Sequence, residues 1–468
     1  MFSPIDTIVA IATPGGRGAI GVVRLSGPQA QAIAGALVAH PHPLEPRRAT
    51  LTRVVSAPPA AATTGVGLRP SDSGTRPALD EVVATYFPAP HSYTTEDVVE
   101  ISAHGSPALL REIVRAAMDA GARLAEPGEF TLRAFLGGRL DLVQAEAVAD
   151  LVDAVTPLQA RVAFDQLDGT LTRAISGLDG RLFDLVTRLE ASIDFPDEGY
   201  HFVGVEAATD ILAGVRDGID ELLARARTGR MIREGFQLAI VGRPNVGKSS
   251  VFNWLVGTER AIVAAAPGTT RDLLHETIDL AGVRVGLVDT AGIRTSDDEV
   301  EREGVARARQ AKRAADFVCV VLDASQALDA TDRDVLAATQ SAPRVVIANK
   351  IDLPRAWADA GVEAVAVSLK TGAGLDELRR ALARALEFVE PRRDEPLVTN
   401  LRHEALLRDA REAIGRALNG LEEARDALDE ELVLADLAGA RRAFDEIVGK
   451  RTSEDVLRAI FARFCIGK

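Results

Sequence analysis

The sequence of 468 residues has few aromatic residues, at 4%, and only two cysteines. Ala, Leu and Val supply most of the apolar 47%, which is typical of a soluble globular protein rich in helix. Cys319 falls in an apolar run and Cys465 lies at the C-terminal end, so we expect no disulfide between them. A reducing cytoplasm is therefore the compartment that the cysteines favour.

Long apolar runs and an excess of positive charge are also absent. No stretch reaches the roughly 18 apolar residues of a membrane-spanning helix, and the N-terminus has no export signal. We therefore expect a cytoplasmic protein without a membrane partner. Lys and Arg number 54 against 68 Asp and Glu, a formal net charge of -14. That balance excludes a general nucleic-acid coat protein, because phosphate contacts require clustered basic residues.

The first part of the chain combines strand-like and helical patterns. Residues 20–25 and 81–86 have the composition of strands, and residues 108–120 have helical periodicity. These patterns predict a small α+β domain. Residues 56–78 are dense in Ala, Pro, Gly, Ser and Thr, so we expect a long surface loop without a functional role.

Two helical stretches flank an alternating segment. Residues 140–230 and 401–464 have helical periodicity, and Asp141 stands where it would cap the first helix. Short apolar runs alternate with helical segments between them, which predicts a doubly wound parallel sheet inserted into a helical domain whose halves meet in space. The runs are 238–241, 283–288, 317–322, 345–348 and 365–367. The expected domains are an N-terminal domain (1–122), a discontinuous helical domain (123–230 and 391–468) and an inserted α/β domain (231–390).

A glycine-rich segment follows the first of these apolar runs. The phosphate-binding loop of nucleotide-binding proteins is matched by Gly242-Arg243-Pro244-Asn245-Val246-Gly247-Lys248-Ser249. Glycines let the main chain curve around phosphate oxygens, Lys248 would reach the terminal phosphates, and the Ser249 hydroxyl would bind Mg²⁺. Taken alone, the segment could also be an ordinary glycine-rich turn.

Two further motifs make a turn the weaker interpretation. The run 283–288 ends in Asp289-Thr290-Ala291-Gly292, where a carboxylate could hold Mg²⁺ through water and the Gly292 N–H could sense the γ-phosphate. Before that run lies Gly268-Thr269-Thr270-Arg271-Asp272, which supplies the Thr270 hydroxyl for the magnesium shell. These contacts predict a switch that depends on the γ-phosphate.

The identity of the base is predicted by Asn349-Lys350-Ile351-Asp352, which follows the run 345–348. The Asp352 carboxylate would accept hydrogen bonds from N1–H and the amino group of guanine. Adenine lacks this pair of donors, so GTP is favoured over ATP. The last run is followed by Ser368-Leu369-Lys370, where G domains contact the guanine oxygen through the main chain.

The residue that would position the attacking water is not evident from these motifs. Ras-like proteins place a glutamine directly after the Asp-x-x-Gly motif, but here that position is Ile293. Carboxylates follow within residues 296–303, but for any one of them we favour a structural interpretation, in which Ser296 and Glu299 form a capping box in the acidic first turn of a helix.

Beyond these motifs, the chain resembles the MnmE (TrmE) family of tRNA modification GTPases over nearly its whole length. The resemblance rests on long matching segments. They are Asp6-Thr7-Ile8-Val9-Ala10, residues 13–18 and 24–27, Glu96-Asp97-Val98-Val99-Glu100, residues 127–136, residues 140–147, Asp194-Phe195-Pro196-Asp197-Glu198 and Phe464-Cys465-Ile466-Gly467-Lys468.

The resemblance implies a folate site in the N-terminal domain, at a homodimer interface. Its residues would be Arg24, Glu100, Arg139 and Lys468, and its ligand 5,10-methylene- or 5-formyl-tetrahydrofolate. Three cations suit an acidic cofactor, and one carboxylate suits the donors of a pterin ring. The family pattern has a lysine at the position of Arg139. The positive charge is kept, but a planar guanidinium group with several donors replaces a compact ammonium group. Without the resemblance, Arg24 and Glu100 would be ordinary charges at strand edges.

The resemblance also implies how GTP would be cleaved without a glutamine. K⁺ would drive pairing of G domains and supply the charge that an arginine finger gives elsewhere. Glu301 would be the catalytic residue that positions the water. The potassium ligands would be Asn245, Ala264, Ala266 and Thr269, within a nucleotide-binding loop formed by Ala264, Ala265, Ala266, Pro267, Gly268 and Thr269.

Cys465 has two interpretations. Its thiolate could attack C6 of a uridine and so activate C5. It could also be a small packing residue at the end of the C-terminal helix, and we favour packing because no histidine neighbours it in the sequence.

The resemblance finally implies a function. A GTPase would act with an FAD-dependent MnmG-type partner, in a heterotetramer, to add a carboxymethylaminomethyl or aminomethyl group to C5 of the wobble uridine of certain tRNAs. The alternatives are a GTP switch in ribosome assembly without modification chemistry, and an N-terminal domain that only dimerises and binds no folate.

Overall fold

The computed structural model describes residues 6–56, 77–194, 204–258, 275–280, 282–288, 315–357, 361–386, 390–423 and 430–467. The chain folds into two compact units. Unit 1 contains Met1–Ala149 together with Asp445–Lys468, and unit 2 contains Asp150–Phe444. The C-terminal residues therefore belong to the same compact unit as the N-terminal domain. No described helix is both long enough and apolar enough to cross a bilayer.

Unit 1 is built on a mixed sheet in the order β3-β4-β5-β2-β1-β6. All neighbouring strands are antiparallel except β1 and β6, which are parallel. The strands are β1 Ile8–Ile11, β2 Ile20–Ser26, β3 Thr50–Val55, β4 Ala78–Phe87, β5 Val98–His104 and β6 Arg123–Leu124. The predicted α+β domain, with strands at 20–25 and 81–86, is confirmed. Most of the predicted loop 56–78 lies outside the described residues, and its last residue begins β4.

Helices α1 (Ala30–Leu37) and α2 (Pro107–Asp119) share a hydrophobic core with this sheet. Successive side chains of a strand point to opposite faces, so Val23 and Leu25 of β2 enter that core. Arg24 between them points to the other face. The same alternation in β5 places Glu100 beside Arg24 in the strand register.

The remaining helices of unit 1 pack residues of the N-terminal part of the chain against residues near its C-terminus. Helix α3 (Glu129–Leu136) and the start of α4 (Leu142–Asp153) pack against Phe461 and Phe464, at and beyond the end of α15 (Glu454–Phe461). The predicted cap is confirmed, because the Gln144 N–H donates to Asp141 Oδ1 at 2.8 Å. Past α15, the C-terminal residues pair with Pro127 through Ile466.

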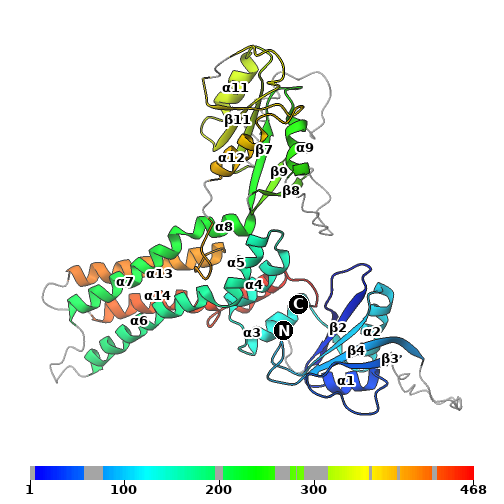
Figure 1. The fold of residues 1–468 in the computed structure, drawn as a ribbon. Helices are drawn as coiled ribbons and strands as arrows, with labels where there is room; N and C mark the ends of the chain where they lie inside the picture. Colours follow the sequence, from blue (N-terminus) through cyan, green and yellow to red (C-terminus); the bar gives the residue numbers. More distant parts are fainter. Residues whose placement is uncertain are drawn as a thin grey trace. The chain divides into compact units, whose positions relative to one another are not determined.

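Unit 2 contains two groups of helices with an α/β domain between them in sequence. The helices are α5 Pro157–Leu167, α6 Thr170–Asp194, α7 Val205–Ala224, α8 Ala226–Glu234, α13 Leu401–Glu423 and most of α14 (Glu430–Val448), whose last residues belong to unit 1. Helix α7 runs alongside α13 (Figure 1), and Arg441 of α14 pairs with Asp179 of α6 at 2.8 Å. The prediction that the helical halves meet in space is therefore confirmed.

The inserted domain has a sheet in the order β12-β11-β10-β7-β9-β8, parallel except for β8 against β9. The strands are β7 Phe236–Val241, β8 His275–Leu280, β9 Val283–Val288, β10 Phe317–Asp323, β11 Arg344–Asn349 and β12 Ala364–Ala366. Helices α9 (Lys248–Thr258) and α12 (Leu375–Ala385) cover one face, and α11 (Ala330–Ala338) covers the other. The predicted doubly wound sheet is confirmed, with Cys319 buried in β10. Ligands of such sheets bind at the carboxyl ends of the strands.

Candidate functional site

The glycine-rich segment 242–249 forms the turn between β7 and α9, as the motif predicts. Gly247 has φ +105, and a Cβ there would lie 2.2 Å from Asn349 Nδ2. At Gly242, with φ +148, a Cβ would lie 2.3 Å from the main-chain oxygen of Val321. Both positions require glycine. Because α9 begins at Lys248, the N–H groups of its first turn lie at the end of this segment, where a phosphate would be stabilised.

Within this loop, Lys248 Nζ donates to the main-chain oxygen of Arg243 at 2.6 Å. Asn245 has φ +63, and both its side chain and that of Ser249 are exposed to solvent. Among the described residues, Lys248, Asn245 and Ser249 therefore lie together in this loop at one edge of the sheet, and Asn245 and Ser249 are accessible from solvent.

The segment 349–352 joins this loop at the end of β11. Asn349 Nδ2 donates to the main-chain oxygen of Val246 at 2.9 Å. Lys350 Nζ donates to the main-chain oxygen of Asn245 at 2.8 Å and pairs with Asp323 Oδ2 at 2.7 Å. The loop predicted to bind the base and the loop predicted to bind phosphate are thus joined by two side chains.

Asp352 is positioned from the next strand along the sheet. The Ser368 hydroxyl, just beyond β12, donates to Asp352 Oδ1 at 2.7 Å. The Leu369 N–H in turn faces Asn349 Oδ1 at 3.4 Å. The segments 349–352 and 368–370 therefore form one connected surface, as expected for residues at the carboxyl ends of neighbouring parallel strands.

Asp323 is a residue of this site that the motifs did not indicate. It ends β10 and is buried beside Lys350 and Ser325. Burial acts to raise the pKa of its carboxyl group, but the hydrogen bonds from Lys350 and Ser325 outweigh burial and hold the pKa below its usual value. Its place at the carboxyl end of a central apolar strand is the one signal that the sequence offers.

Several predicted residues lie outside the described part of the chain. They are Ala264, Ala265, Ala266, Pro267, Gly268, Thr269, Thr270, Asp289, Thr290, Ala291, Gly292, Ile293 and Glu301. The predicted capping pair, Ser296 and Glu299, lies outside it too. Their roles stay predictions.

In unit 1, two of the four predicted folate residues contact one aromatic ring, and a third pairs with one of these two. Arg24 Nη2 pairs with Glu100 Oε1 at 2.8 Å, and the Arg24 Cζ lies 5.3 Å from the centroid of Tyr93. Arg139 contacts the same ring, with its Cζ 5.0 Å from the centroid, and donates to the Tyr93 main-chain oxygen at 2.8 Å. The motifs did not indicate Tyr93, because nothing in the sequence shows that its loop lies between the two arginines.

The fourth residue, Lys468, lies outside the described residues. The preceding residue, Gly467, packs tightly against β1, because a Cβ at this position would lie 2.2 Å from the main-chain oxygen of Ile11. Ile11 of β1 pairs with Val23, the neighbour of Arg24. The described C-terminal end therefore reaches the strand next to Arg24.

A buried group of charges supports the loop that carries Tyr93. Arg133 lies in α3 and pairs with Glu96 at 3.1 Å, Asp6 at 2.7 Å and Glu129 at 2.9 Å. Burial acts to raise the pKa of Glu129, but hydrogen bonds from Arg123 and Arg133 hold it below its usual value. These pairs tie the 92–97 loop to α3 and the N-terminal segment.

Comparison with known proteins shows the family of the chain. The family model described as "GTP-binding protein TrmE N-terminus" matches residues 7–139, and the model described as "MnmE helical domain" matches residues 142–465. The chain belongs to the MnmE family. Three relatives, each named "tRNA modification GTPase MnmE", are from Koribacter versatilis, Moorella thermoacetica and Aquifex aeolicus. They are 45%, 44% and 44% identical to this chain, with 99% of the chain and 99%, 99% and 100% of the relative covered.

One prediction for this MnmE-family chain is wrong. Cys465 is exposed, so it is not a packing residue. The helix ends at Phe461, and the chain then runs past the buried Phe464 to the pairing between Pro127 and Ile466. Cys465 is therefore an exposed residue between the buried Phe464 and Ile466, which pairs with Pro127.

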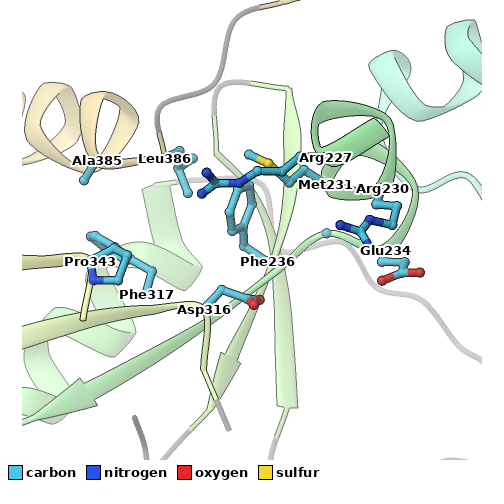
Figure 2. A pocket seen from close by; sticks show the side chains of 11 residues that line it. Arg227, Arg230, Met231, Glu234, Phe236, Asp316, Phe317, Pro343, Ala385 and Leu386 are labelled. Carbon is cyan, nitrogen blue, oxygen red and sulfur yellow. The ribbon is translucent and has the colours of Figure 1, made fainter. Parts of the chain in front are cut away.

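Unit 2 of this MnmE-family chain also has a pocket of about 320 Å³ (Figure 2). It lies at the amino ends of β7 and β10, whereas the predicted nucleotide site lies at the carboxyl ends of the strands. Its lining residues are Arg227, Arg230, Met231, Glu234, Gly235, Phe236, Asp316, Phe317, Pro343, Ala385 and Leu386. Arg230 pairs with Glu404 at 3.2 Å, and Asp316 accepts a hydrogen bond from the Gln237 N–H at 2.9 Å. None of the lining residues belongs to the nucleotide motifs.

Proposed function

We propose that this protein binds and hydrolyses GTP in the inserted domain and uses that cycle to modify C5 of the wobble uridine of certain tRNAs. The observation that carries the proposal is the joined pair of loops, in which Lys350 and Asn349 connect the segment 349–352 to the phosphate-binding loop. Guanine would be recognised by Asp352, which Ser368 holds in place. The names of the relatives support tRNA as the substrate.

Mg²⁺ and K⁺ would bind at the same edge of the sheet. The exposed hydroxyl of Ser249, in the first turn of α9, suits Mg²⁺, which prefers hard oxygen ligands. The exposed amide of Asn245 suits K⁺. Thr270 would complete the magnesium shell, and Ala264, Ala266 and Thr269 would complete the potassium site. Potassium would offset charge on the phosphates during hydrolysis.

In this proposal Glu301 positions the attacking water, because Ile293 cannot. Hydrolysis then depends on K⁺, which would pair the G domains of two chains. GTP turnover measured in KCl and in NaCl tests this step, and the wild type is expected to be faster in KCl. Equal rates in the two salts, or an unimpaired Glu301→Ala variant, would contradict it.

A tetrahydrofolate would bind beside Tyr93 and supply the one-carbon unit of the modification. The residues present fit such a ligand: two guanidinium groups suit its carboxylates, Glu100 suits the donors of the pterin ring, and the Tyr93 ring offers a flat apolar surface. Lys468 would add a third cation, since the preceding residue lies at β1. The exposed Cys465 thiol is available for attack on uridine, which makes it a candidate for that chemistry.

The protein would act in the cytoplasm as a homodimer, within a heterotetramer that includes an FAD-binding MnmG-type partner. Reconstitution tests this function: the chain, that partner, unmodified tRNA, a methylene-tetrahydrofolate, an amine (an ammonium salt or glycine) and GTP are combined with Mg²⁺ and K⁺, and the nucleosides of the tRNA are analysed. Modification is expected only when both proteins and GTP are present. A GTP switch in ribosome assembly would instead leave the tRNA unchanged and alter ribosomal subunit profiles.

A further inference from the structure

Arg243, the second residue of the phosphate-binding loop, is tied to a helix on the other face of the sheet. Its Nε donates to Asp332 Oδ1 at 2.8 Å, and its Nη1 donates to Asp329 Oδ2 at 2.6 Å. The Asp332 side chain is 1% exposed and that of Arg243 17% exposed. The bond to Asp332 is shielded from water, whereas the Asp329 side chain is 45% exposed, so the contact with Asp332 is the stronger of the two charge-assisted bonds.

Both aspartates are already fixed by the start of α11. Asp329 is the N-cap and accepts from the Asp332 N–H at 2.9 Å through Oδ1, while Asp332 Oδ2 faces the Asp329 N–H at 3.3 Å. Each carboxylate therefore uses one oxygen for this capping box and the other for Arg243. Val335 and Leu336 of α11 pack into the core below the sheet, so the anchor is rigid.

The main chain of Arg243 faces the phosphate site. Its carbonyl oxygen accepts from Lys248 Nζ at 2.6 Å. One residue thus contacts α11 through its guanidinium group and the phosphate-binding lysine through its carbonyl oxygen. Movement of the Arg243 side chain would shift the carbonyl group and, with it, the curve of the loop.

We propose that Arg243 is a positioning residue, which holds the phosphate-binding loop in its binding shape through the capping box of α11. A loop held in shape before binding loses less conformational freedom when phosphate arrives, so affinity for phosphate rises. The inference rests on the proposed nucleotide site but adds α11 to it. It predicts that substitution of Arg243 weakens binding of the phosphate groups of the nucleotide and leaves binding of the guanine base unchanged.

The other end of α11 offers a matched control. Arg344 Nη1 donates to Thr339 Oγ1 at 2.9 Å and also to the main-chain oxygen of Leu336. Arg344 begins β11, at the amino end of the strand and away from the phosphate-binding loop. Both arginines hold α11, but only Arg243 belongs to the loop. A purely structural role would make their substitutions equivalent.

The test compares Arg243→Gln, Arg243→Lys and Arg344→Gln in the full chain. The dissociation constant of a fluorescent GDP is measured directly, that of guanosine is measured by competition, and thermal unfolding without nucleotide reports on the fold. Arg243→Gln is expected to weaken GDP binding about tenfold, the effect of losing one or two charge-assisted bonds. Its guanosine affinity should stay within about twofold of the wild type. Arg243→Lys should recover part of the loss, because a lysine can reach one carboxylate.

Arg344→Gln should leave GDP affinity within about twofold even where it lowers the unfolding temperature as much as Arg243→Gln does. Asp332→Asn provides a milder second variant if Arg243→Gln folds poorly. It should also lower the affinity for GDP more than the affinity for guanosine. Equal losses of GDP and guanosine affinity, or equal losses in the two arginine variants, would overturn the inference. A wild type that binds no GDP would instead overturn the proposed nucleotide site.

Discussion

The amine of Lys350 donates to the main-chain oxygen of Asn245 at 2.8 Å and joins the base-recognition loop to the phosphate-binding loop. The same amine pairs with Asp323, which is buried at the end of β10. Lys350 itself has φ +69, a conformation that a non-glycine residue adopts only when its surroundings hold it there. The two loops are therefore not independent, and a change in one is expected to alter the other.

Lys350→Met should weaken both nucleotide binding and the fold. It removes the bond to Asn245 and leaves the Asp323 carboxylate buried without its cation, which costs about 2–3 kcal/mol of unfolding free energy. Denaturant unfolding and GDP calorimetry measure the two effects. Lys450→Ala is the control, because the Lys450 side chain is largely exposed and its 3.5 Å pair with Asp445 should contribute under about 1 kcal/mol. Unchanged GDP binding in Lys350→Met would show that the loops act separately.

The ionised Asp323 carboxylate should make the free energy of unfolding depend on pH in the acidic range. Its pKa is lowered in the folded protein, so its contribution is present above the ordinary aspartate pKa of about 4 and is lost as the pH falls through the folded value. Asp323→Asn removes this titration. The unfolding free energy of the variant should therefore fall less steeply between pH 7 and pH 3 than that of the wild type. Parallel curves for the two proteins would contradict the assignment.

Gly247→Ala should abolish tight nucleotide binding. The added Cβ would lie 2.2 Å from Asn349 Nδ2, and the residue has φ +105, so either the loop or Asn349 must move. Gly257→Ala, near the end of the following helix α9, is the matched control because nothing lies within 4 Å of its Cβ. That variant should bind GDP normally and be up to about 1 kcal/mol more stable. The expectation fails if both variants bind alike.

Tyr93→Leu should weaken tetrahydrofolate binding. Two guanidinium groups contact the ring, and removing a flat aromatic surface between cations is worth about 0.5–2 kcal/mol, or roughly two- to thirtyfold in affinity. Arg24→Ala should abolish measurable binding because it also frees Glu100. Calorimetry with 5-formyl-tetrahydrofolate measures both, and Arg53→Ala on the exposed side of β3 is the control. No folate binding by the wild type would favour a domain that serves only for dimerisation.

The α/β domain could be predicted from sequence because each strand is a short apolar run followed by a chemically specific motif. Leu238 to Val241 precedes the glycine-rich loop, and residues 345–348 precede Asn349. Since parallel strands end at one edge, the motifs could also be expected to meet. The positions of residues that directly follow a strand in the sequence can therefore be predicted.

Contacts made across long sequence separations could not be predicted in this way. Asp332 and Arg243 are 89 residues apart and each is unremarkable by itself. Tyr93 lies in a loop that is held by the ion pair between the buried Arg133 and the partly exposed Glu96, which no periodicity reveals. The exposure of Cys465 could not be predicted, because it depends on where α15 ends and on the pairing of the next residue with Pro127.

In the proposed function, the nucleotide cycle of this chain serves tRNA modification. The most direct measurement is nucleoside analysis of tRNA from cells that lack the protein, complemented in turn by the wild-type chain, Gly257→Ala and Gly247→Ala. Loss of the C5 modification of the wobble uridine is expected without the protein, with recovery from the wild type and Gly257→Ala but not from Gly247→Ala. Unchanged wobble uridine modification in cells without the protein would contradict the claim.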